Sequence, residues 1–217
     1  MTSATDPTTP AAARPRRRDR AARELEMLDA AEDIFGERGY AGTSMDDVAA
    51  RAGVSKPLVY QYYGSKDGLF VACLARLRAQ LFESVADVVL TAPDAERAMY
   101  EGLAQWFRFL DEHPRAWAVM VDEGMLSAGP AAEAADQVRA DFVELIASMV
   151  RINLPAERET SEDEIHVVAQ ALSGATERLA VWRSRHGGGP PPEQVAAMLM
   201  NLFWIGLRGV RAGESWA

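Results

Sequence analysis

The sequence predicts an all-α protein in which a small N-terminal three-helix domain precedes a larger helical domain. Apolar residues recur at spacings of three and four along most of the chain, which is typical of amphipathic helices. Gly and Pro clusters separate these stretches, and no segment alternates with the period of two that a strand requires. Hydrophobic residues make up 48% of the 217 positions, which is enough to form a sizeable core.

Several features of composition predict a soluble, cytoplasmic protein. No run of about 18 apolar residues is present, and the polar N-terminus lacks the apolar segment of a secretory signal. The single cysteine, Cys73, cannot form an internal disulfide. Because Cys73 lies beside an apolar helical stripe, we expect a buried structural thiol rather than a redox sensor.

The net charge of −9 is unevenly distributed along the chain. Most of the acidic excess lies in the C-terminal two thirds, whereas the stretch from Arg14 to Arg23 holds six arginines and one acid, Asp19. Local placement of Lys and Arg decides attraction to phosphate, so the total charge does not exclude nucleic acid. We expect residues 1–18 to form a disordered basic arm, either a solubilising tail or an added phosphate or minor-groove contact.

The first helix is expected over residues 20–38, with Leu28 and Phe35 on its apolar face and Gly39 at its end. Thr43 or Ser44 is expected to cap a short helix to Arg51. Ser55 is expected to cap a third helix that has Pro57 in its first turn, closes at Gly64 and is followed by a cap at Ser65. Further helices are predicted at about 66–90, 94–112, 114–125, 131–152, 162–186 and 192–212.

Residues 44–61 have the pattern of a helix-turn-helix, with Gly53 allowing the chain to reverse between two short helices. Val48, Ala49 and Val54 supply a small apolar interior. The second helix presents Ser55, Lys56, Tyr60, Gln61 and Tyr62, whose side chains are able to reach phosphates or base edges in a major groove. Structural helical hairpins share this pattern, and Tyr60 or Tyr63 could instead be core aromatics.

The stretch from Gly39 to Phe70 resembles the tetracycline-repressor (TetR) family of bacterial regulators. The resemblance is carried by Gly39-Tyr40, Thr43-Ser44, Val48-Ala49, Gly53-Val54-Ser55, Tyr60, Tyr63, Lys66 and Leu69. It implies that Thr43, Ser44, Tyr62 and Lys66 hold phosphates, and that Ser55, Lys56, Pro57, Tyr60 and Gln61 face the groove. Lys66 could also be a solvated charge. Tyr63 departs from the more frequent Phe, so its hydroxyl needs a partner or access to water. The domains expected are 1–18 (arm), 19–66 (DNA binding) and 67–217 (ligand binding and dimerisation).

Dimerisation is expected because one short recognition helix offers too small an interface for tight specific binding. Residues 162–186 carry a heptad-like seam, and the last helix adds apolar residues with a close-packing glycine. Together with the TetR resemblance, this predicts a four-helix bundle between two chains; the alternative is a purely intramolecular core. The expected interface residues are Ile165, Val168, Leu172, Ala175, Leu179, Trp182, Leu199, Leu202, Phe203 and Gly206.

Bulky and flexible apolar residues in the middle of the chain suit an adaptable pocket, although such stripes also form ordinary cores. The candidate pocket residues are Trp106, Trp117, Met120, Met125, Phe142 and Glu177. Glu177 either faces a polar or cationic ligand group or lies on a solvated helix face.

No enzyme, metal-site or cofactor motif is present: the three histidines are widely spaced, and no Gly-rich phosphate loop or nucleophile elbow occurs. We therefore expect a bacterial, nucleoid-associated transcriptional repressor without a cofactor or membrane partner. It is expected to bind a palindromic operator as a homodimer and to be released by a small lipophilic effector. A helical adaptor that has lost DNA binding is the rival interpretation.

Overall fold

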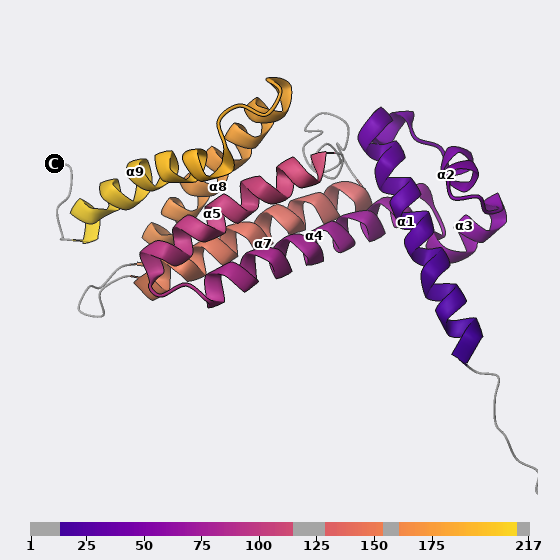
Figure 1. Ribbon diagram of the computed structural model, residues 1–217, viewed down its shortest axis with the longest axis horizontal. Helices are drawn as coiled ribbons and strands as arrows, with labels where there is room; N and C mark the ends of the chain where they lie inside the picture. The colour runs from indigo at the N-terminus through magenta and orange to yellow at the C-terminus, as the bar shows by residue number, and fades with distance from the viewer. Residues whose placement is uncertain (1–13, 115–128, 154–160, 212–217) are drawn as a thin grey trace, which may run out of the picture.

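A computed structural model of the chain describes residues 14–114, 129–153 and 161–211, and within these ranges every regular element is an α-helix (Figure 1). The expected all-α fold is confirmed. The helix expected at 114–125 lies almost wholly outside the described residues. The described helices are α1 (Arg14–Gly42), α2 (Met45–Arg51), α3 (Lys56–Tyr63), α4 (Lys66–Leu90), α5 (Ala95–Glu112), α7 (Pro130–Asn153), α8 (Glu162–Arg185) and α9 (Pro192–Arg211).

Helix α1 is longer at both ends than the sequence pattern predicts. It begins at Arg14, so residues 14–18 are helical and do not belong to a disordered arm; the remainder of the expected arm lies outside the described residues. At its other end Gly39 has φ 69° and ψ 175°, which interrupts the helix before a last turn reaches Gly42. The expected break at Gly39 is therefore present as a kink.

Helices α2 and α3 form the helix-turn-helix that the sequence predicts. Ser44 is the N-cap of α2, where its Oγ accepts the N–H of Asp47 at 3.1 Å. Gly53 turns the chain with φ 66°, a left-handed conformation that a residue with a Cβ rarely adopts. Ser55 occupies the N-cap position of α3, but its side chain makes no capping hydrogen bond.

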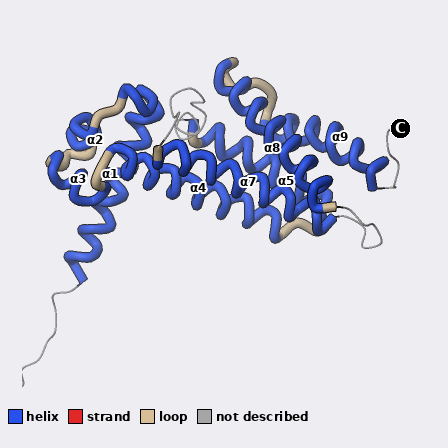
Figure 2. The backbone as a smooth tube through the Cα atoms, turned by 180° about the vertical axis from the view of Figure 1, so that it is seen from behind, coloured by secondary structure: helices blue, strands red, loops and turns tan. Residues whose placement is uncertain are grey.

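Two apolar cores are present, and α4 contributes to both. Figure 2 shows α4 running from the N-terminal helices into the larger helical bundle. The first half of α4 packs with α1, α2 and α3, and the start of α7 also contributes to this N-terminal core. The expected boundary after residue 66 therefore falls too early, because Leu74 still belongs to the N-terminal core. This core includes Met27, Leu28, Ile34, Phe35, Val48, Val59, Leu69, Phe70, Cys73, Leu74, Ala131 and Ala135.

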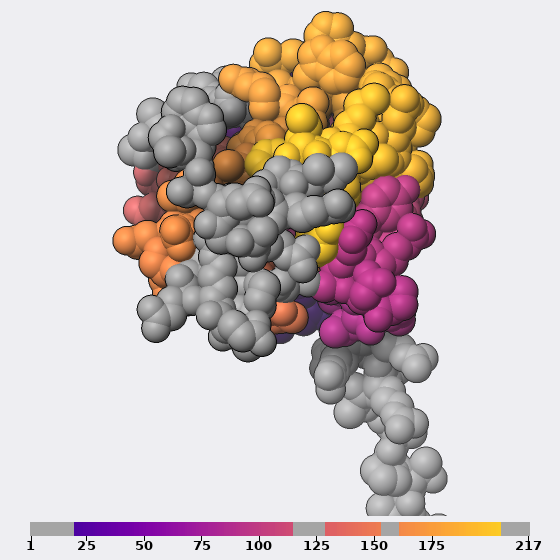
Figure 3. Space-filling model, turned by 90° about the vertical axis from the view of Figure 1, so that its left-hand side faces the viewer, coloured from indigo at the N-terminus to yellow at the C-terminus, as the bar shows by residue number. Residues whose placement is uncertain are grey.

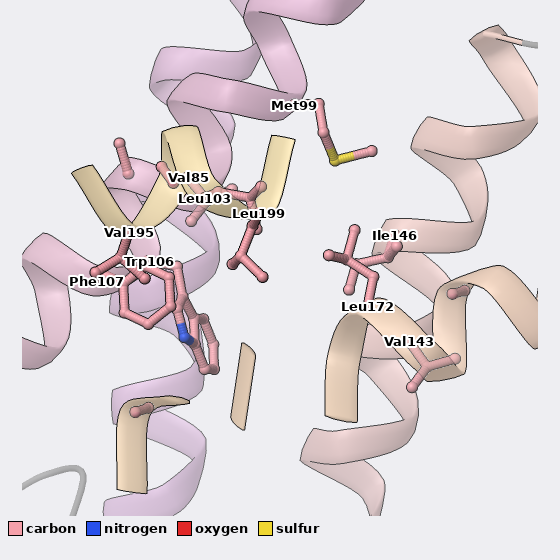
Figure 4. Close-up of a cluster of buried hydrophobic side chains, with 14 of the residues drawn as sticks. Val85, Met99, Leu103, Trp106, Phe107, Val143, Ile146, Leu172, Val195 and Leu199 are labelled. Atoms are coloured by element: carbon pink, nitrogen blue, oxygen red, sulfur yellow. The ribbon is translucent and has the colours of Figure 1, made fainter. Parts of the chain in front are cut away.

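The C-terminal core is formed by the second half of α4 together with α5, α7, α8 and α9. Figure 4 shows Trp106 and Phe107 of α5 in this cluster, with Leu172 of α8 and Leu199 of α9. Helix α5 packs against both α4 and α9, and α7 packs against both α4 and α8. In Figure 3, α8 and α9 lie together on one side of the molecular surface. Among the described helices, none combines the length and apolar character needed to cross a membrane.

Candidate nucleic-acid interface and ligand pocket

The outer face of α3 consists of exposed side chains that do not pack in the core. Val59 is fully buried, whereas Ser55, Lys56, Pro57 and Gln61 are exposed. Tyr60 is 42% exposed, so it is not the core aromatic that the alternative interpretation required. The residues expected to face a major groove therefore share one accessible surface.

Lys56 lies in an ion pair on this surface. Its Nζ donates to Oδ2 of Asp46 at 2.8 Å, and both side chains are largely exposed. The hydrogen bond to Asp46 raises the pKa of Lys56, so the side chain is cationic over the physiological range. A nucleic acid that contacts Lys56 must therefore displace or share the carboxylate of Asp46.

Thr43 and Ser44, which were both expected to hold phosphates, have different surroundings. Thr43 is 3% exposed, and its hydroxyl donates to the carbonyl of Gly39 at 2.8 Å, which ties the segment between α1 and α2 to the kink in α1. The expected phosphate contact of Thr43 is therefore corrected: the side chain is buried, and its hydroxyl proton is already donated within the domain. Ser44 is exposed, and its hydroxyl donates to Asp47 Oδ2 at 2.6 Å.

The aromatic residues at the end of α3 have different surroundings. Tyr63 is partly buried, and its hydroxyl donates to the carbonyl of Glu24 at 3.2 Å, which is the partner that this departure from Phe requires. Burial also raises the pKa of Tyr63. Tyr62 lies under the guanidinium of Arg20, 5.4 Å from its ring centroid. Arg20 was not among the DNA-binding residues expected from the sequence. Its position in the arginine-rich stretch from Arg14 to Arg23 was the signal that could have indicated it.

Lys66 begins α4 where the helix dipole disfavours a cation. Its Nζ lies 4.3 Å from the centroid of the Tyr40 ring and donates to the carbonyl of Ala41 at 3.5 Å. The hydroxyl of Tyr40 in turn donates to Asp67. These contacts hold the Lys66 cation at the edge of the N-terminal domain, near α3.

An apolar pocket with a cavity volume of about 30 Å³ lies between α4, α5, α7 and α8. Three of the expected pocket residues, Trp106, Phe142 and Glu177, line it together. Trp106 and Phe142 stack with ring centroids 4.1 Å apart. Trp117, Met120 and Met125 lie outside the described residues. The full lining is Leu74, Leu81, Phe82, Trp106, Ala135, Val138, Arg139, Phe142, Ser173 and Glu177.

The polar end of this pocket is an ion pair that the sequence did not reveal. Arg139 Nε lies 3.5 Å from Glu177 Oε1, and Arg139 Nη1 lies 2.7 Å from Asp136 Oδ1. Glu177 thus faces the pocket with a cationic neighbour. Phe142 marked the α7 wall correctly, but its other α7 residues and the α4 wall were missed, because each helix carries a regular apolar stripe, which alone does not distinguish a pocket wall from a filled core.

The expected dimer residues divide into buried and exposed groups. Ile165, Leu172 and Leu199 are at most 3% exposed and pack within the chain's own C-terminal core, so their assignment to an interface is corrected. Figure 4 shows Leu172 and Leu199 in this core. The heptad spacing marks the inner face of α8. Val168, Ala175, Leu179 and Phe203 are partly buried against the same core, and Trp182 and Leu202 are exposed. The structure describes Gly206 as part of the α9 backbone but does not describe its contacts.

Fold and surface together define a class: a helical protein with an N-terminal helix-turn-helix, a larger helical bundle, and an apolar pocket lined by residues of both cores. The family profile described as "Bacterial regulatory proteins, tetR family" matches residues 27–73. The profile described as "Tetracyclin repressor-like, C-terminal domain" matches residues 95–206, which is more than half of the chain. The chain belongs to the TetR family of transcriptional regulators.

Individual relatives agree with this membership. A crystal structure of a TetR-like transcriptional regulator from Rhodococcus sp. RHA1 is 33% identical, with a TM-score of 0.71, and covers 87% of this chain and 97% of that one. The transcriptional regulator EthR of Mycolicibacterium smegmatis is 26% identical over 96% of this chain and 97% of its own. The transcriptional activator FasR of the same organism is 32% identical over 100 residues, so that match spans about half of each protein, 46%.

Proposed function

We propose that this TetR-family protein is a repressor that binds a palindromic operator as a homodimer and is released by a small lipophilic effector. The observation that carries the proposal is the outer face of α3, where Lys56, Pro57, Tyr60 and Gln61 are exposed on a helix-turn-helix whose interior is otherwise filled. Lys and Gln are suited to guanine and adenine edges, and Pro57 or the Tyr60 ring to a thymine methyl. Ser44, Tyr62 and Lys66 are the expected phosphate contacts.

Dimer formation is supported by apolar side chains that α8 and α9 leave exposed. Val167 and Trp182 on α8, and Met198 and Leu202 on α9, are exposed between 43% and 71% in the single chain. Two recognition helices held by one dimer would enter successive major grooves about 34–36 Å apart, which requires an operator with twofold symmetry.

Effector binding is supported by the pocket between α4, α5, α7 and α8. Its walls are almost entirely apolar, and its single polar end is formed by Arg139, Glu177 and Ser173. A pocket with this lining suits a ligand that has an apolar body and one polar group.

The direct test is selection of bound sequences from a pool of randomised duplexes, followed by anisotropy titration of the selected duplex. We expect an enriched site with two inverted half-sites about 10 base pairs apart, bound with strong salt dependence. Recovery of an unenriched pool without salt-dependent binding would contradict the proposal and favour the helical adaptor instead.

A further inference from the structure

Three cations on or next to the helix-turn-helix form ion pairs with carboxylates of the same domain. The partner distances lie between 2.8 and 3.4 Å. A carboxylate partner lowers the positive potential that a phosphate meets at each of these points, so this surface supplies little uncompensated charge. The pairs are Lys56 with Asp46, Arg38 with Asp47, and Arg51 with both Asp33 and Glu37.

Arg20 and Arg23 on α1 differ from these cations. Both are exposed, and among the side chains that the structure describes, no carboxylate lies within ion-pair distance of either guanidinium. Arg20 instead lies over the ring of Tyr62, a contact that leaves its positive charge uncompensated. Arg20 and Arg23 are therefore uncompensated cations on α1, beside the end of α3, in addition to Lys66 at the start of α4.

The first turns of α1 extend past the end of α3, as both backbone views show (Figures 1 and 2). Two contacts fix this stretch against the end of α3: Arg20 on Tyr62, and the Tyr63 hydroxyl on the Glu24 carbonyl. The backbone from Arg14 to Arg23 is helical, so at 1.5 Å per residue it covers about 14 Å. Residues 14–26 contain six arginines and three acidic residues, a local cationic excess in a chain of net charge −9.

We infer that the start of α1, with Arg20 and Arg23 at its centre, is a second phosphate-binding element that grips the duplex backbone beside the half-site read by α3. The inference rests on the proposed DNA binding and extends it beyond the helix-turn-helix. The partner is the sugar–phosphate backbone, because the element offers unpaired arginines next to the surface of α3. It contributes affinity and salt dependence for any sequence, and no choice between bases.

The double variant Arg20→Gln/Arg23→Gln tests this inference on the full chain. Its binding to a labelled 30-base-pair duplex of random sequence is measured by anisotropy over a series of NaCl concentrations. We expect the slope of log affinity against log salt to become shallower by about one to two, since each lost phosphate contact contributes about 0.9. The ratio of affinities for a selected operator and the random duplex should stay constant. A hydroxyl-radical footprint on that operator should shorten at its outer ends.

The matched control is Arg97→Gln/Arg185→Gln, which removes the same charge from exposed positions on α5 and α8 and should leave the slope unchanged. Arg20→Lys/Arg23→Lys keeps the charge and should keep the slope; a loss of slope in this variant would overturn the inference. So would an unchanged slope in the folded glutamine variant, or an equal loss in the control. Wild-type protein that binds no duplex at all would remove the proposed function as well.

Discussion

At the scale of single residues, Lys56 is expected to contribute to sequence discrimination and Lys66 to affinity for any duplex. Lys56 is exposed on the recognition face, whereas Lys66 is held on the Tyr40 ring at the domain edge. We expect Lys56→Ala to reduce discrimination between operator and random duplex by about 1–3 kcal/mol. Lys66→Ala should weaken both complexes equally and make the salt slope about one unit shallower. Anisotropy titrations with both duplexes give the two quantities.

The ion pair of Lys56 provides a control for this division. Asp46→Asn removes the carboxylate that competes with DNA for Lys56, so it should strengthen binding to both duplexes. If Lys56→Ala and Lys66→Ala lost affinity and discrimination in the same proportions, the assignment of base reading to Lys56 would be wrong.

At the scale of elements, the junction of α3 and α4 depends on a glycine. A Cβ at Gly68 would lie 2.1 Å from the carbonyl oxygen of Tyr63, an atom of the backbone that cannot move aside alone. We expect Gly68→Ala to lower the free energy of unfolding by about 1–3 kcal/mol, measured by chemical denaturation. Gly102→Ala is the matched control, because its nearest neighbour is a Val89 methyl at 3.3 Å, and it should cost less. Equal losses in the two variants would contradict this explanation.

The joint between α1 and α4 contains a carboxyl group whose pKa is displaced. Arg76 on α4 lies 3.1 Å from Glu32 on α1 and also contacts Asp29. Burial raises the pKa of Glu32 from 4.5 to about 7, although Arg76 acts in the opposite direction. The folded protein therefore holds this proton more tightly than the unfolded chain does. The stabilisation is complete below pH 4.5 and is lost as the pH rises through about 7.

This displacement predicts that the free energy of unfolding falls between pH 5 and pH 8. Glu32 accounts for up to about 3 kcal/mol of the fall, at about 1.4 kcal/mol per pKa unit. Denaturant titrations of wild type and Glu32→Gln across this range measure it, and the variant should show a flatter profile. A variant with the wild-type profile would show that other groups control the pH dependence.

At the scale of the whole molecule, the proposed dimer is testable at Leu202. This side chain is 71% exposed on α9, so Leu202→Glu should leave the single chain folded while placing a charge in the desolvated interface. We expect sedimentation to show a monomer and operator affinity to collapse. Leu90→Glu, at an 83% exposed position ending α4, should remain dimeric. Wild-type protein that sediments as a monomer at micromolar concentration would exclude the dimer.

The pocket touches both cores, which suggests how an effector would act on DNA binding. Leu74 and Ala135 line the pocket and also belong to the N-terminal core, whereas Ser173 lines it from α8. Ala135→Leu should imitate an effector and lower operator affinity by about 5- to 150-fold, the usual range of such coupling. Ser173→Leu fills the same space from the far wall and should have a smaller effect. Equal effects in operator titrations would argue against coupling through this joint.

Much of this arrangement was predictable from the sequence because helix signals are local. Ser44, Gly53, Gly64 and Ser65 mark helix ends directly. The inner face of α8 was mistaken for a dimer seam because spacing shows that Leu172 needs an apolar neighbour but not which chain supplies it. Likewise, the burial of Thr43 depends on its hydrogen bond to Gly39, and the pocket depends on how four helices meet. These are tertiary properties that local pattern does not contain.

The contribution of α7 to the N-terminal core has a consequence for building chimeric regulators. Ala131 and Ala135 are 2% and 8% exposed, and both pack among residues of α1 to α4 although they follow them by more than fifty positions. A module cut after α4 and grafted onto a foreign sensor would lack these two alanines, and apolar surface would be left open. A functional chimera should therefore include the first turns of α7, or an equivalent helix of small residues, together with the N-terminal module.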